Sequence, residues 1–156
     1  PPAAAPTASA NRQFGDFAEL TGWSPLPTSV RPGDVLTGSV YCRAVARPDR
    51  DYTIFVHVGR EGSPPVAQFD GYPRAGAYPT GVWRAGDVIE HPYAVTLPAE
   101  TQAGEYALLV GMYDGATGAR VPVRRPGLAG LVERLRGLLG REAGETAVSL
   151  GAVVVR

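Results

Sequence analysis

Apolar and polar residues alternate with a period of two along several short stretches of the chain, and turn residues separate these stretches. The pattern is clearest in 104–114, where Tyr106, Leu108, Val110 and Met112 share one face. The runs 35–44 and 51–60 are also strand-like, and the second is dense in β-branched and aromatic residues. Further short strand-like runs lie at 66–70, 86–99 and 146–156. Alternation of this kind is typical of β-strands that bury one face.

The composition agrees with many short elements joined by turns. The chain has 156 residues, of which 20 are Gly and 15 are Pro, well above the usual share. We therefore predict an all-β, Ig-like β-sandwich of seven to eight antiparallel strands over residues 12–156. The segment 1–11, which begins "PPAAAPTASA", has the composition of a linker. Such a linker commonly joins a domain to a membrane anchor or to another domain.

One segment has a different period. Between "RVPV" and the last strand, apolar residues recur at helical spacing, which predicts an inserted amphipathic helix over about 127–140 within an insertion of about 124–145. The predicted interaction face consists of Leu128, Leu131, Leu135 and Leu138. This face needs cover, and three arrangements would provide it: packing on its own domain, a homodimer, or the membrane surface. We favour packing on the domain, because the segment lacks the aromatic anchors of interfacial helices.

Two local motifs predict turn and corner geometry. The stretches "VRPGDVL" from Val30 and "WRAGDVI" from Trp83 share a Gly–Asp pair just before a strand. Gly suits a positive φ and Asp can bind its own nearby backbone, so both stretches predict the same tight turn. In "LPAETQAGEY", Tyr106 stands where Ig-like sandwiches place a tyrosine corner.

The charge and the reactive residues exclude several functions. The 15 basic residues, all Arg, balance 15 acidic ones, so the chain lacks the basic footprint of a nucleic-acid binder. Its one cysteine, Cys42, lies in an apolar run and is predicted to be a buried, inert thiol. Two histidines, His57 and His91, are too few for a zinc site of their own. No nucleophile elbow or phosphate loop occurs. We expect no metal, no cofactor and no catalysis.

The pattern of motifs resembles a known domain family. In this chain the pattern consists of "YTIFVH", Asp70 and Pro73, "YPTGVW" followed by Gly86, "GEY", and "GMYD". It resembles the extracytoplasmic C-terminal β-sandwich domain of bacterial multi-spanning membrane proteins of the dolichyl-phosphate-mannose mannosyltransferase-like class. The resemblance implies a noncatalytic accessory domain, tethered to the cell membrane and partnered with a membrane-spanning catalytic region of the same polypeptide.

The loop "AYPTGVWRAGDVI", which begins at Ala77, and the residues before it hold the best candidates for ligand binding. Tyr72, Tyr78 and Trp83 could form an aromatic platform for a glycan, with Asp70 beside it. The chain would then be a freestanding carbohydrate-binding module. Alternatively, Tyr78 and Trp83 cover the end of the core and hold a long crossover in place. We favour this structural role, because Pro and Gly between the aromatic residues are typical of a packed irregular loop.

Overall fold

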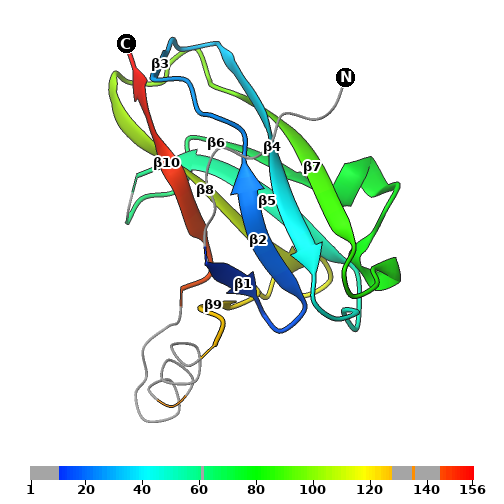
Figure 1. The fold of residues 1–156 in the computed structure, drawn as a ribbon. Coiled ribbons are helices and arrows are strands. Elements are labelled where there is room, and N and C mark those ends of the chain that lie inside the picture. Colours follow the sequence, from blue (N-terminus) through cyan, green and yellow to red (C-terminus); the bar gives the residue numbers. More distant parts are fainter. Residues whose placement is uncertain (1–10, 61, 128–134, 136–144) are drawn as a thin grey trace.

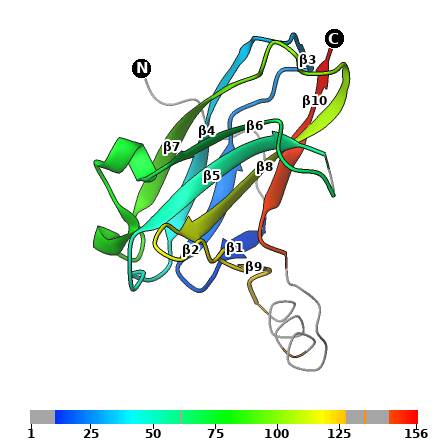
Figure 2. The same cartoon turned by 180° about the vertical axis from the view of Figure 1, so that it is seen from behind.

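In the computed structural model, which describes residues 11–60, 62–127, 135 and 145–156, the chain forms two β-sheets packed face to face (Figures 1 and 2). The strands are β1 (Arg12–Phe14), β2 (Ala18–Trp23), β3 (Ser29–Val30), β4 (Val35–Ala44), β5 (Tyr52–Gly59), β6 (Ala67–Gly71), β7 (Val88–Thr96), β8 (Gly104–Asp114), β9 (Val123–Arg124) and β10 (Val148–Val155). Two single-turn 3₁₀ helices, η1 (Pro73–Gly76) and η2 (Thr80–Val82), lie in the crossover from β6 to β7. Among the described residues, no helix has the length and apolar character needed to cross a bilayer.

Each sheet has five strands. Sheet A has the order β7-β4-β2-β1-β9, and sheet B has the order β3-β10-β8-β5-β6. Every pairing is antiparallel except that of β10 with β3, where Val154 lies opposite Ser29 and Val155 opposite Val30. This pairing brings the C-terminal end of β10 beside β3 (Figure 1). The expected all-β sandwich is present, but with ten described strands and one parallel pair.

The core lies between the sheets and follows the predicted alternation. On β8 the side chains of Tyr106, Leu108, Val110 and Met112 are all buried. On β5 the inward set is Ile54, Val56 and Val58, each fully buried. Cys42 is also buried in this core, as its apolar run predicted.

The prediction of an inserted helix is wrong for the part of the chain that the structure describes. That part contains strands and two 3₁₀ turns, and no inserted helix. The two sheets close over their core with strand and crossover residues, so the fold needs no helical cover there. Most of the predicted helix, 128–134 and 136–144, lies outside the described residues. The homodimer, which was one alternative to packing of this helix on its own domain, stays a prediction.

The two Gly–Asp turns have the same geometry, as predicted. The Asp34 Oδ2 accepts a 2.8 Å hydrogen bond from the Arg31 amide, and Asp87 Oδ2 accepts one of 2.8 Å from the Arg84 amide. The glycine before each aspartate has a positive φ, 86° and 92° respectively. A residue with a Cβ would be strained at these two positions.

The tyrosine corner is confirmed as well. The Tyr106 hydroxyl donates a 2.8 Å hydrogen bond to the carbonyl oxygen of Gln102, in the crossover that leads into β8. The ring of Tyr106 is buried and belongs to the core cluster. This bond fixes the crossover from sheet A to sheet B at the start of β8.

Candidate ligand-binding site

The crossover that contains η1 and η2 is held in place by its own polar groups. Trp83 is fully buried, and its indole Nε1 donates a 3.0 Å hydrogen bond to the Tyr78 carbonyl. The Tyr78 hydroxyl donates to Asp87 Oδ2 at 2.5 Å. The buried Thr80 hydroxyl donates to the Arg50 carbonyl at 2.8 Å and accepts from the Tyr52 amide at 2.9 Å. In this arrangement the indole of Trp83 has no free face for a ligand.

A second group of side chains lies on the outer face of sheet B. Strand alternation points Thr53, Phe55 and His57 of β5 away from the core, because Ile54, Val56 and Val58 point into it. Phe55 is nevertheless only 1% exposed. Its ring lies over Gly111 of β8, where a Cβ would come within 2.2 Å of Phe55 Cζ. The glycine thus provides the space that lets an outward aromatic ring lie flat on the sheet.

Other side chains cover this ring and extend the group. The rings of His57 and Tyr113 lie 4.4 Å and 6.2 Å from the Phe55 ring, centroid to centroid. The Arg120 guanidinium carbon lies 4.7 Å above the same ring, a favourable cation–π geometry. Arg120 pairs with Tyr113 through an isolated β-bridge. We call the following residues the outer-face cluster: Phe55, His57, Asp70, Tyr72, Tyr113 and Arg120.

The Asp70 carboxylate connects the polar groups of the cluster. Its Oδ2 accepts a 2.9 Å hydrogen bond from the Tyr113 hydroxyl, and its Oδ1 lies 3.3 Å from His57 Nε2. Since a carboxylate only accepts, Nε2 is the nitrogen that carries the proton in neutral His57. The Asp70 side chain remains 25% exposed. A carboxylate has about four lone-pair sites, so Asp70 can accept further hydrogen bonds from a ligand.

The cluster also shifts the titration of its members. Burial lowers the pKa of His57, and the nearby Asp70 carboxylate opposes this shift only in part. Burial, followed by the hydrogen bond to Asp70, raises the pKa of Tyr113. Near neutral pH both shifts favour the neutral forms of these two groups, the uncharged His57 imidazole and the protonated Tyr113 phenol.

Tyr72 and Arg120 give the cluster its accessible surface. Tyr72, which directly follows β6, is 47% exposed. Its hydroxyl lies 3.9 Å from the position that a Cβ of Gly115 would occupy, on the turn after β8. Arg120 is exposed on the far side of the same turn. The cluster thus exposes an aromatic ring, a guanidinium and part of the Asp70 carboxylate to solvent.

The structure brings together only part of the predicted site. Asp70 and Tyr72 both belong to the outer-face cluster, whereas Tyr78 and Trp83 serve the crossover. Among the predicted helix residues Leu135 is exposed, and Leu128, Leu131 and Leu138 lie outside the described residues.

Phe55, His57, Tyr113 and Arg120 were not among the ligand-binding residues predicted from the sequence. For Phe55, His57 and Tyr113, the signal that could have found them is the period of two in β5 and β8. It places Phe55 and His57 on one face of β5, and Gly111 and Tyr113 on the same face of β8, opposite to the buried set.

The described residues offer little for metal or thiol chemistry. Within that part of the chain no group of three or more His, Cys, Asp or Glu side chains could hold a metal ion. Burial raises the pKa of the Cys42 thiol to about 12. A thiol with such a pKa is a poor nucleophile near neutral pH.

Comparison with known proteins identifies the fold but no family. No family model matches the chain, and no curated protein matches it. Among solved structures, the chain is similar to the C-terminal domain of Wzt, with a TM-score of 0.51 and 11% sequence identity. The match covers 93% of this chain and 77% of the other. At this identity the likeness shows a shared fold alone, and the resemblance to the mannosyltransferase-like class stays a prediction.

Proposed function

We propose that the chain is a noncatalytic accessory domain that binds a glycan on its outer-face cluster. The observation that carries the proposal is the grouping of Tyr113, Asp70 and Arg120 around Phe55 on the outer face of sheet B. The exposed Tyr72 ring directly follows β6 at the edge of this group. Sugar rings present an apolar face of C–H groups and a rim of hydroxyls. Tyrosine rings can contact that apolar face, while a carboxylate and a guanidinium accept from and donate to the hydroxyls.

The same geometry favours binding over catalysis. His57 and Asp70 face each other as an acid–base pair would, but none of the hydrogen bonds described for the chain joins a serine or a cysteine to His57. A nucleophilic mechanism requires such a partner within hydrogen-bond reach of the base. Moreover, both Asp70 oxygens already interact with neighbouring side chains. This supports a role in positioning and ligand recognition.

For the cellular setting we propose an extracytoplasmic domain, tethered to the membrane through the linker of residues 1–11. In this proposal it assists a membrane-spanning, glycosyltransferase-like catalytic region of the same polypeptide. The support is the set of family-pattern residues, of which Phe55, His57, Asp70 and Tyr113 meet in the outer-face cluster. Fractionation of source cells tests this: the native protein should sediment with membranes and be cleaved by protease added to spheroplasts. Recovery in the secreted fraction would favour the freestanding carbohydrate-binding module.

Glycan binding is tested by ¹⁵N NMR titration of the isolated chain with a panel of hexoses and oligosaccharides. Sugars that bind should shift the amides of Tyr72, Tyr113 and their neighbours, because these residues form the accessible part of the cluster. Tyr72→Ala should weaken binding at least about fivefold, as expected for loss of an aromatic contact. The matched control is Val88→Ala, a truncation of another exposed residue on sheet A. Unchanged binding by Tyr72→Ala, or a panel that leaves these amides unmoved, would refute the proposal.

A further inference from the structure

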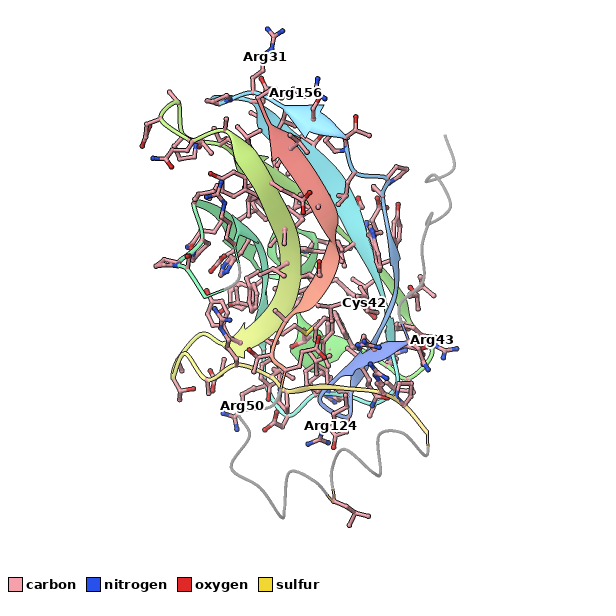
Figure 3. The ribbon with its side chains drawn as sticks, turned by 90° about the vertical axis from the view of Figure 1, so that its left-hand side faces the viewer. Arg31, Cys42, Arg43, Arg50, Arg124 and Arg156 are labelled. Atoms are coloured by element: carbon pink, nitrogen blue, oxygen red, sulfur yellow. The ribbon has the colours of Figure 1, made fainter. Side chains whose placement is uncertain are left out.

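One end of the sandwich contains a cavity of about 650 Å³ beside the outer-face cluster. Its lining comes from the turn between β1 and β2, the loop before β5 and the turn after β8. Four arginines line it: Arg47, Arg50, Arg120 and Arg124. Figure 3 shows Arg50 and Arg124 at this end of the molecule, and Arg31 and Arg156 at the opposite end. We call this feature the arginine-lined cavity.

Three of these guanidinium groups are available to a ligand. Arg50 is engaged, because it pairs with Asp114 at 2.8 Å and with Asp49 at 2.9 Å. The other three, Arg47, Arg120 and Arg124, form no ion pair with another described residue. Arg47 uses only its Nε, which donates to the Gly81 carbonyl at 2.8 Å.

The acidic residues of the lining do not cancel this charge. Asp16, Asp49 and Asp114 are the carboxylates in the lining, and two of them already face Arg50. Four cations against three anions leave a net positive site. The planar forks of free guanidinium groups match carboxylate and phosphate oxygens.

Arg120 belongs to both features, since it lines the cavity and covers Phe55 in the outer-face cluster. Its backbone also lies opposite Tyr113. A sugar ring resting on the tyrosines would therefore place a substituent within reach of the cavity. We propose that the arginine-lined cavity is an anion subsite, which selects glycans that carry a carboxylate or a phosphate ester. This inference rests on the proposed glycan-binding function.

The test compares sugars that differ only in charge. The isolated chain is titrated by ¹⁵N NMR with glucose, galactose and mannose, with the three corresponding hexuronates, and with their 6-phosphates. We expect at least one acidic sugar to bind about tenfold more tightly than its parent, as one or two charge-assisted hydrogen bonds would give. Raising NaCl from 20 to 300 mM should reduce this ratio, because exposed charges are screened. The hexuronate and phosphate arms show which anion the cavity selects.

Substitutions of the lining arginines test whether the cavity is the source of the preference for acidic sugars. Arg120→Gln and Arg124→Gln, made singly, should each reduce the preference for the acidic sugar to about twofold or less. Arg31→Gln removes the same charge at the opposite end of the molecule (Figure 3), and it should leave the preference unchanged. Amide spectra of each variant check the fold, and Arg124 serves as the second variant because it does not cover Phe55.

The outcomes separate the two proposals. If no sugar moves the amides of the outer-face cluster, glycan binding itself fails. If parents and acidic sugars bind equally, glycan binding stands and the anion subsite is refuted. If the acidic preference is real but survives both Arg120→Gln and Arg124→Gln, the cavity is not its source and the inference is also overturned.

Discussion

Acidification should destabilise the fold through one buried histidine, His91. Its side chain points into the core from β7, between Ile89 and Tyr93, and the residue is only 2% exposed. Neither ring nitrogen has a hydrogen-bond partner among the described residues, and its ring neighbour is Phe69, 6.0 Å away between centroids. Burial without a partner lowers the pKa of His91 to about 4 from 6.5. The core therefore accepts only the neutral imidazole.

The sign and size of the effect follow from this shift. Above pH 6.5 the imidazole is neutral in both folded and unfolded chains, so the histidine has no effect on how stability changes with pH. Between 6.5 and 4 the unfolded chain binds a proton that the folded chain rejects, and stability falls. With about 1.4 kcal/mol for each unit of the pKa difference, the loss reaches about 3 kcal/mol at pH 4. That is a large fraction of the stability of a typical domain.

The assay is urea unfolding of the wild type and His91→Leu at several pH values from 7.5 to 4. Asp49, Asp87 and Asp114, whose pKa values are lowered by hydrogen bonds, also lose stabilisation on acidification, but equally in both proteins. The difference between the two curves therefore reports His91. At pH 7.5 the variant should be at least as stable, since an apolar group replaces unpaired polar atoms. At pH 4 the difference in free energy of unfolding between the variant and the wild type should be larger than at pH 7.5 by about 3 kcal/mol, in favour of the variant. Parallel curves, or an NMR pKa of His91 near 6.5, would refute the reasoning.

Three further substitutions test the packing described above, each by urea unfolding at neutral pH. Trp83→Ala should cost about 3–5 kcal/mol, because a large, fully buried ring is removed; a loss below about 1 kcal/mol would contradict its structural role. Tyr106→Phe should cost about 1 kcal/mol by deleting the bond to Gln102, and an unchanged free energy would show that the corner bond is dispensable. Gly111→Ala should cost about 1–3 kcal/mol, because the new Cβ would displace the Phe55 ring; full stability would mean that the ring can move at no cost.

Much of the fold could be predicted from the sequence because its signals are local. Strand-like runs of eight or more residues identified β4, β5, β7, β8 and β10, and turn chemistry identified the two Gly–Asp turns. The strands β1, β3 and β9 have only two or three residues, which is too short for a period to appear. Their pairing depends on long-range register. The parallel pairing of β3 with β10 is likewise invisible to local pattern.

For the part of the chain that the structure describes, the expected helix was wrong for a related reason. Leucines at helical spacing show only that a helix, if formed, would be amphipathic. The core of the sandwich does not need an apolar helix face to fill it, because strand and crossover residues already do so. For the site, aromatic residues close in sequence suggested a platform, but the crossover turns Trp83 into the core. The residues that do meet, such as Phe55 and Tyr113, are 58 positions apart and come together through the β5–β8 register.

The motif residues separate into two groups with different physical roles. In the crossover, Tyr78, Thr80 and Trp83 direct their polar atoms to backbone or to Asp87, so their interactions are satisfied within the domain. In the outer-face cluster the apolar part is likewise satisfied, because Phe55 is covered.

The polar rim of the outer-face cluster retains unused capacity: Asp70 has exposed lone pairs, and Tyr72 presents nearly half of its surface. Core stability requires neither a carboxylate nor a tyrosine on the solvent side of sheet B, since the buried cluster is complete on the other side. The excess of donors, acceptors and ring surface therefore supports the proposed recognition at this face, and the adjoining arginine-lined cavity is the proposed source of a preference for negative charge.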